Sequence, residues 1–530
     1  MDLISQLPEA LLHEILHLLP EKDSVRTCVL SKAWCGIQSR SPFLWFDEFD
    51  FPAQSLFEEN TLEAILEDRK RKELFADYIN RRLQRLLSQK DSPPLELFML
   101  SVIEFDPLND PPRIDSWLKR VSEKGVKCII LRHMGENDSP LNLPRCVFAS
   151  QTLHELTLAD CAVNFCGDIE IPSLRNLILF NVNVDDDVMK CFISGCPLLE
   201  ILSISFCDAL TCLQANNLAM LKIVVLHYCS FLKKVEILSP NVQSFEYKES
   251  SGNCSEEAPK LILALSTSIK KITLVYANIT SDCLQQYIPT CEELVLVGIP
   301  GFESAKISGK DVSKLTIEGS DNMTKVPVID CPNLQSLVYA QNKLPFHAVQ
   351  NFKLRNTKLE FNLDGKQEFD AWLAELKGFF DNLNSKLELI MVIGSKEYEA
   401  NELMLPVLYD FKDSMPKAKV IISNSLELDK LMDEIFSFES HVSSVALNVA
   451  SAHSSNSIFS QLVRMKADEN CCKEGVFRCW RHYSCNLKKD YASNSIPAVL
   501  KSYKSEQYQI TKILVKREEA TKTNAIPQDF

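Results

Sequence analysis

The stretch CPLLEILSISFC (residues 196–207) carries the pattern that decides the fold of this chain. Its apolar residues Leu199, Leu202 and Ile204 follow an apolar-x-x-apolar-x-apolar spacing. The last two stand two residues apart, so they point to the same side of a short β-strand. A strand of this length cannot bury its apolar side alone. It therefore needs neighbouring strands of the same kind.

The same spacing recurs ten times between residues 126 and 339. The ten units are Val126/Ile129/Leu131, Leu153/Leu156/Leu158, Leu174/Leu177/Leu179, Leu199/Leu202/Ile204, Leu221/Val224/Leu226, Val242/Phe245/Tyr247, Ile269/Ile272/Leu274, Cys291/Leu294/Leu296, Val312/Leu315/Ile317 and Leu334/Leu337/Tyr339. They begin 27, 21, 25, 22, 21, 27, 22, 21 and 22 residues apart, within the range of about 20–29 residues that leucine-rich repeats show. Cys161, Cys207 and Cys229 each stand eight residues after the start of a unit, where the consensus has a buried asparagine or cysteine. The spacing predicts a solenoid with one strand per repeat.

The first fifty residues hold more apolar side chains than a few short helices can bury among themselves. Pro8 suits the first position of a helix, and Pro20 must end it. Asp23 or Ser24 can cap a second helix that continues past Trp34. Because a contiguous exposed apolar surface usually marks an interface, the surplus predicts a partner protein.

The same segment contains HEILH (residues 13–17), which matches the zinc motif H-E-x-x-H. His13 and His17 stand one helical turn apart, but a zinc protease also needs a third ligand. No acidic residue or histidine stands between Asp23 and Asp47 to supply one nearby. We interpret the motif as part of an ordinary docking helix, with no metal and no cofactor.

Residues 2–46 resemble the F-box of plant F-box/leucine-rich-repeat proteins. The residues in register are Asp2, Ile4, Ser5, Leu7, Pro8, Leu12, Ile15, Leu16, Leu19, Pro20, Lys22, Asp23, Val25, Arg26, Thr27, Val29, Leu30, Ser31, Lys32 and Trp34. The segment departs from the family at Ala33, Cys35 and Gln38. The resemblance implies docking onto a Skp-type adaptor and, through it, a cullin ligase core. The predicted adaptor-binding residues are Leu7, Pro8, Leu11, Leu12, Ile15, Leu16, Leu19, Pro20, Val25, Val29, Leu30 and Trp34.

The expected fold class is α/β, with a small helical F-box, a leucine-rich-repeat solenoid and an α+β C-terminal cap. The domain boundaries are expected at 1–50 for the F-box, 51–94 for a helical linker and 95–345 for the solenoid, with 92–100 as an opening strand or capping repeat. Residues 346–502 are expected to form an FBD-like region, with helices at 366–383 and 427–438 and strands at 387–393 and 419–424. The segment CWRHY (479–483) resembles the ending of many plant F-box/leucine-rich-repeat chains. Residues 503–530 are expected to be a frayed polar tail.

Composition narrows the possible partners and compartments. A formal net charge of −14 argues against binding to nucleic acid or anionic membranes. The 19 cysteines stand mostly in apolar runs, where reduced cysteine behaves as a small buried hydrophobe. No secretory leader and no run of about 18 apolar residues is found, so no membrane span is predicted. We expect the cytoplasm or nucleus. The basic cluster at residues 69–72 is either a nuclear localisation signal or, as we favour, a solvated helix face.

No catalytic constellation is found. The stretch SAKISGKD (304–311) lacks the first glycine and the final hydroxyl of a phosphate-binding loop. We therefore expect a non-catalytic substrate-recognition subunit of an SCF (Skp–cullin–F-box) ubiquitin ligase, with an unknown target protein held by the repeats. Two alternatives stay open. One is a leucine-rich-repeat scaffold outside any ligase, and the other is a receptor whose target surface is completed by a small molecule.

Overall fold

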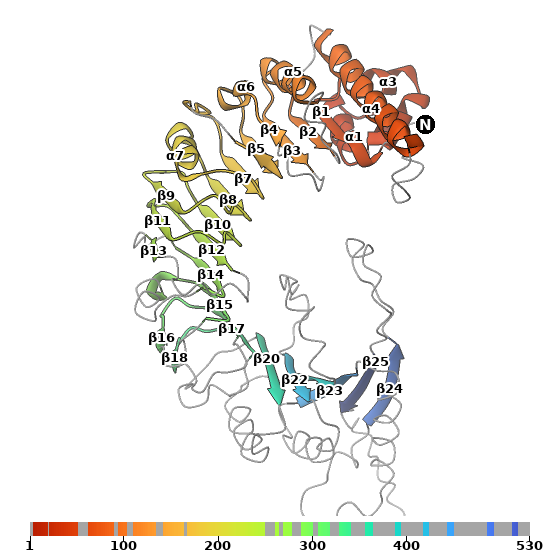
Figure 1. Ribbon diagram of the computed structural model, residues 1–530. Coiled ribbons are helices and arrows are strands. Elements are labelled where there is room, and N and C mark those ends of the chain that lie inside the picture. The colour runs from red at the N-terminus through yellow and green to blue at the C-terminus, as the bar shows by residue number, and fades with distance from the viewer. Residues whose placement is uncertain are drawn as a thin grey trace, which may run out of the picture. The chain divides into compact units, whose positions relative to one another are not determined.

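A computed structural model gives the architecture of the chain (Figure 1). It describes residues 4–19, 21–50, 62–88, 94–102, 110–133, 141–163, 167–249, 260–263, 269–277, 288–299, 306–318 and 328–340, together with six later strands between 356 and 517. The chain forms two compact units. The first comprises Met1–Ile269 with Tyr276–Asn278, and the second comprises Lys270–Val275 with Ile279–Phe530.

The first unit begins with the short helices η1 (Ile4–Gln6), α1 (Glu9–His17), α2 (Glu21–Arg26), η2 (Thr27–Val29) and α3 (Lys32–Ser39). Helix α1 starts directly after Pro8, as predicted. The prediction of one continuous second helix that runs past Trp34 is wrong, because the backbone is extended at Ser31 and interrupts it. The Ser31 hydroxyl accepts a 3.2 Å hydrogen bond from the Trp34 amide and so caps a new helix, α3.

One parallel sheet runs through the first unit. Its strands, in spatial order, are β1 (Phe43–Asp47), β2 (Leu97–Val102), β3 (Cys128–His133), β5 (Glu155–Ala159), β7 (Asn176–Phe180), β8 (Ile201–Ser205), β10 (Ile223–His227) and β12 (Ser244–Lys248). The crossovers contain the helices α4 (Leu62–Ser88), α5 (Asp110–Glu123), α6 (Arg145–Phe148) and α7 (Asp186–Gly195). Strand β4 (Leu141–Asn142) pairs with β6 (Cys161–Ala162), and β9 (Cys212–Asn216), β11 (Lys234–Leu238) and β13 (Lys260–Leu263) form a further parallel sheet. Figure 1 shows α5, α6, α7 and then β9, β11 and β13 following one another along one side of the main sheet.

The repeat register predicted from the sequence is confirmed. Six neighbouring strands of the first unit place equivalent residues opposite one another, each paired with the next: Ile129, Leu156, Leu177, Leu202, Val224 and Phe245. All ten leading residues, from Val126 to Leu334, are buried. Each strand thus buries its apolar side against the next repeat. The parallel sheet starts earlier than expected, because β1 pairs with β2 and the segment 51–94 contains α4 as the crossover between them.

Several repeats turn sharply where their strand ends. Asp160, Asn181, Phe206, Tyr228 and Tyr276 have left-handed backbone conformations, with φ between 49° and 57°. The amide of each of the first four donates to a carbonyl of the neighbouring strand at 2.7–2.9 Å. In three repeats the next residue is a buried cysteine, as predicted for Cys161, Cys207 and Cys229. The turn thus carries the chain from the strand into the interior of the repeat.

The second unit continues the same architecture and then departs from it. Strands β14 (Lys271–Val275), β15 (Glu293–Val297), β17 (Lys314–Glu318) and β19 (Ser336–Ala340) are parallel and in register. They are followed in space by the parallel strands β20 (Asn356–Leu363), β22 (Lys417–Ile422), β21 (Leu387–Ile393) and β23 (Val442–Val449). The second unit also contains the turn η4 (Ile288–Thr290) and the parallel pair β16 (Lys306–Ser308) and β18 (Val328–Asp330).

The C-terminal end of the chain differs from expectation in one respect. The strand predicted at 387–393 is β21, and the one predicted at 419–424 overlaps β22. The tail expected to fray from residue 503 instead contains strand β25 (Thr511–Arg517). It pairs antiparallel with both β23 and β24 (Cys485–Tyr491). The polar composition misled the prediction, since a strand needs only alternate apolar residues such as Ile513 and Val515. The helices predicted at 366–383 and 427–438 and the segment 479–483 lie outside the described residues.

Candidate adaptor-binding surface

The N-terminal helices enclose a very small core. Leu12, Leu16 and Trp34 are 2–5% exposed and pack together, with Ile15 and Ile37 partly buried against them. Leu12 and Leu16 are one helical turn apart in α1, so they present one stripe to α3. Because this core holds only three fully buried side chains, most apolar residues of the segment are not part of it.

Many apolar residues of the same segment are exposed to solvent. Leu18, Val29 and Leu30 are 82%, 88% and 69% exposed. The further members of this exposed apolar face are Ile4, Leu7, Leu11, Leu19 and Val25, each at least 37% exposed. Leu11 in α1 and Leu18, the helical residue that caps its C-terminal end, are seven residues apart, which places them on the same side of the helix axis. A chain in water gains nothing by exposing so many adjacent apolar groups, so the face is suited to binding another protein.

The structure divides the twelve predicted adaptor-binding residues into two groups. Leu7, Pro8, Leu11, Leu19, Val25, Val29 and Leu30 are exposed, whereas Pro20 lies outside the described residues. Leu12, Leu16 and Trp34 are buried and Ile15 is half-buried, so these four form the support of the face. Sequence reasoning left out Ile4 and Leu18. The surplus of leucines in the segment was a signal for Leu18. Apolar spacing alone, however, does not distinguish the buried residues that support the face from the exposed residues that form it.

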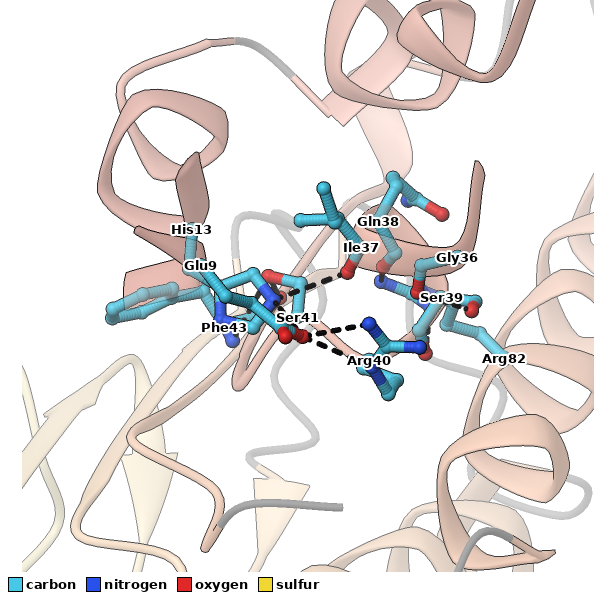
Figure 2. A network of polar contacts seen from close by, with 10 residues as sticks. All are labelled: Glu9, His13, Gly36, Ile37, Gln38, Ser39, Arg40, Ser41, Phe43 and Arg82. Carbon is cyan, nitrogen blue, oxygen red and sulfur yellow. Dashed lines mark hydrogen bonds and ion pairs between the residues drawn. The ribbon is translucent and has the colours of Figure 1, made fainter. Parts of the chain in front are cut away.

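Polar contacts join α1 to the end of α3 (Figure 2). Arg40 donates to the Glu9 carboxylate at 2.8 and 3.0 Å. The Nε2 atom of His13 lies 3.2 Å from the Ile37 carbonyl oxygen. Burial lowers the pKa of His13 below its ordinary value, although the Ile37 carbonyl acts in the opposite direction. A neutral His13 can therefore donate to Ile37 inside this contact.

The two histidines of the HEILH motif make different contacts. His13 bonds to Ile37, whereas the His17 ring stacks on Phe43 with ring centroids 4.3 Å apart. Across the part of the chain that the structure describes, no group of three histidine, cysteine or acidic side chains could hold a metal ion. His13 thus contacts α3, and His17 packs against the first residue of β1.

Helix α4 joins the N-terminal helices to the sheet. Arg82 is 5% exposed and donates to the carbonyl oxygens of Gln38 and Ser39 at 2.6 and 3.0 Å, as Figure 2 shows. A cation at the last carbonyls of a helix is favourable, because these oxygens lack partners within the helix. A second buried pair joins Arg71 of α4 to Glu48 at 2.8 Å, directly after β1. Helix α4, which lies within the segment expected to be a linker, is therefore packed against neighbouring elements.

Comparison with known proteins agrees with this geometry. Residues 4–46 match the family described as the F-box domain, and residues 94–258 match the At1g61320/AtMIF1 LRR domain. The putative F-box/LRR-repeat protein At3g59170 of Arabidopsis thaliana is 28% identical over 49% of this chain and 56% of its own length. The F-box/FBD/LRR-repeat protein At2g04230 of the same plant is 28% identical over 38% of this chain and 41% of its own length. The chain thus spans about half the length of these two relatives.

A third relative gives a longer match at lower identity. The putative F-box/LRR-repeat protein At3g18150 of Arabidopsis thaliana is 23% identical over 79% of this chain and 90% of its own length. Residues 4–46 are therefore an F-box domain, and residues 94–258 are a leucine-rich-repeat domain. The relatives of the chain are the F-box/LRR-repeat and FBD-associated F-box proteins of Arabidopsis, which confirms the family resemblance seen in its sequence.

Among the helices that the structure describes, none is both long and apolar enough to cross a bilayer.

Proposed function

We propose that this chain is the substrate-recognition subunit of an SCF-type ubiquitin ligase. The exposed apolar face of its F-box would bind a Skp-type adaptor and, through it, a cullin ligase core. The leucine-rich repeats would hold a target protein beside the ubiquitin-loading machinery. The observation that carries the proposal is the set of eight exposed apolar residues within a segment that matches the F-box domain.

The proposed contribution to ubiquitin transfer is proximity. A bound target presents its lysines to a charged conjugating enzyme at a high local concentration. The chain itself would transfer no ubiquitin, because F-box proteins of this kind act as adaptors without a catalytic site.

The binding test must use exposed residues. Replacing Leu12, Ile15 and Leu16 together by alanine would remove two of the three core side chains and so unfold the F-box. Replacing Val29 and Leu30 by aspartate instead places two charges on the exposed apolar face, with no loss of core packing. An interface that must desolvate those carboxylates becomes strongly unfavourable.

The experiment is co-expression of the full chain with a Skp-type adaptor, followed by size-exclusion chromatography. The wild-type chain should co-elute with the adaptor, and the Val29→Asp/Leu30→Asp variant should elute alone with unchanged thermal unfolding. Phe231→Asp is the matched control, since Phe231 is 61% exposed in the repeats and should not affect adaptor binding. A folded wild-type chain that elutes alone would instead favour the scaffold alternative.

A further inference from the structure

The outward face of β7, β8 and β10 is unusually apolar. In the first four residues of each strand, fully buried inward-pointing residues alternate with half-buried outward-pointing ones. Four of these outward positions hold aliphatic side chains, where a solvated strand would carry polar ones: Ile178, Ile201, Ile223 and Val225. Strand register places Ile201 opposite Ile223, and the pairs Ile178–Ser203 and Ser203–Val225 follow two residues further on. We call these four residues the aliphatic floor.

Aromatic residues border the floor where the three strands end. Phe180 ends β7, and Phe206 and Tyr228 directly follow β8 and β10. The ring centroids of Phe180 and Phe206 are 5.1 Å apart, and those of Phe206 and Tyr228 are 4.8 Å apart with nearly parallel planes. Phe180 and Phe206 are 46% and 41% exposed. The three rings form a continuous apolar surface, the aromatic edge.

The backbone beneath this edge is strained. Phe206 and Tyr228 have φ values of 57° and 54°, a region that bulky side chains rarely adopt. Asn181 occupies the same turn in the preceding repeat at no such cost. Large aromatic rings are thus retained at positions where asparagine or glycine would fit the backbone better. Strain of this kind is concentrated at sites that bind ligands.

Charged residues border the floor where the strands begin. Arg175, Glu200 and Lys222 directly precede β7, β8 and β10. The Glu200 carboxylate accepts from Arg175 at 2.5 Å and from Lys222 at 2.6 Å. The two cations are 52% and 43% exposed, whereas the carboxylate between them is only 19% exposed. This basic edge therefore presents two partly exposed cations to solvent around one largely covered carboxylate.

Carboxylates flank this edge on both neighbouring strands. On β5 the Glu155 carboxylate accepts a 3.2 Å hydrogen bond from Asn176, the residue after Arg175, whereas Lys222 precedes β10, two strands beyond β7 along the sheet. On β12 the Glu246 carboxylate is bonded to both Lys248 and His227, so its negative charge is already compensated. The hydrogen bonds of Lys222 and Arg175 lower the pKa of Glu200, which keeps it ionised as the bridge between the cations. The basic edge is thus a lasting feature of this face at neutral pH.

From this arrangement we propose that the face formed by the aliphatic floor and its two edges binds an extended, acidic segment of the target protein. One aromatic or long aliphatic side chain of that segment lies on the floor against the aromatic edge. A carboxylate a few residues away pairs with Arg175 or Lys222. The two edges are separated by a five-residue strand, or roughly 15 Å, which about five extended residues span. A basic segment would meet like charge at the same edge.

The role of this face as a target site rests on the proposed function, but the binding chemistry can be measured alone. The probe is a fluorescein-labelled glycine–serine peptide that carries a glutamate pair near a leucine–phenylalanine pair. Two comparison peptides replace the glutamates by lysine, or the leucine and phenylalanine by serine. Fluorescence polarisation with the purified full chain should show binding of the first peptide at least about tenfold tighter than of either other peptide.

Two variants localise the site. Phe206→Asn removes one ring but suits the left-handed backbone, so the fold is retained. It should weaken binding of the acidic peptide at least about fivefold. Lys222→Glu should lower the binding affinity of the acidic peptide and raise that of the lysine peptide. Leu238→Ser is the matched control, because Leu238 is equally exposed at 43% but lies in the β9–β11–β13 sheet.

Specific outcomes overturn the proposal. A lysine peptide that binds as tightly as the acidic peptide, or more tightly, contradicts the proposal. A chain that is folded, as shown by cooperative unfolding, but binds no peptide also contradicts it. So does a Phe206→Asn variant with unchanged affinity for the acidic peptide. Adaptor co-elution of the same preparations separates the two proposals. Peptide binding without adaptor binding would refute the ligase role only, and adaptor binding without peptide binding would refute this site only.

Discussion

The guanidinium of Arg82 in α4 donates a 3.0 Å hydrogen bond to the carbonyl oxygen of Ser39, the last residue of α3. The two residues are 43 positions apart in the chain. The contact joins the helices that carry the exposed apolar face to the helix that crosses between the first two strands of the sheet. The F-box is thus held in a fixed orientation to its own unit by a buried cation.

Loss of this cation should destabilise the first unit. Arg82→Met leaves the Gln38 and Ser39 carbonyls without their charged donor, at an expected cost of about 2–4 kcal/mol in the free energy of unfolding. Urea unfolding followed by tryptophan fluorescence measures this cost. The neighbouring Arg81→Met is the control, since Arg81 is 75% exposed and should change stability by no more than about 0.5 kcal/mol. Equal effects of the two substitutions would contradict the assigned role of Arg82.

Adjacent leucines of α1 should respond oppositely to truncation. Leu12→Ala opens a cavity in the small core and should cost about 2–5 kcal/mol, whereas Leu11→Ala should cost less than about 0.5 kcal/mol. Adaptor binding should show the reverse order among folded variants, because Leu11 is 50% exposed. Thermal unfolding and adaptor co-elution test the two halves of this prediction. A Leu11→Ala variant that is as unstable as Leu12→Ala would show that the assignment of core and surface is wrong.

Acid should weaken the F-box through His13. Because burial lowers the folded-state pKa of His13 below 6.5, the unfolded chain binds a proton more readily than the folded chain. The stabilisation is fully present above pH 6.5 and is lost as the pH falls below that value toward the folded-state pKa. Unfolding curves at neutral and mildly acidic pH should show this loss in the wild type. His13→Gln should flatten the dependence, and an unchanged slope would exclude His13 as its source.

Thiol reactivity should report the burial of the repeat cysteines. Burial raises the pKa of Cys196, Cys207 and Cys291 to about 12, so the reactive thiolate is scarce as well as shielded. Cys35 is exposed in α3. Brief iodoacetamide treatment of the native chain, followed by peptide mass spectrometry, should label Cys35 and leave the three buried thiols unmodified until denaturant is added. Early labelling of Cys207 would contradict the packing described for its repeat.

Local spacing was sufficient to predict the repeats, since each apolar triplet has the same environment as the next. Ile129, Leu156 and their partners are placed by period alone. The division of the apolar F-box residues into buried and exposed ones was not predictable from spacing. Leu11 and Leu12 are chemically identical neighbours, and only the crossing of α1 over α3 decides which one is buried. The Arg82 contact had no sequence signal, because its acceptors are backbone carbonyls. Strand β1 was missed because its partner β2 begins 54 residues later, beyond an intervening helix.

The pairing of β1 with β2 limits how these chains can be cut and recombined. A fragment ending after the family-defined F-box at residue 46 would retain most of β1 but lose its hydrogen-bonding neighbour and the α4 side chains that cap α3. Such a fragment would present an unprotected strand edge and would tend to aggregate. Transplanting this F-box onto another receptor would therefore require a junction beyond Val102, with the first crossover carried along as part of the graft.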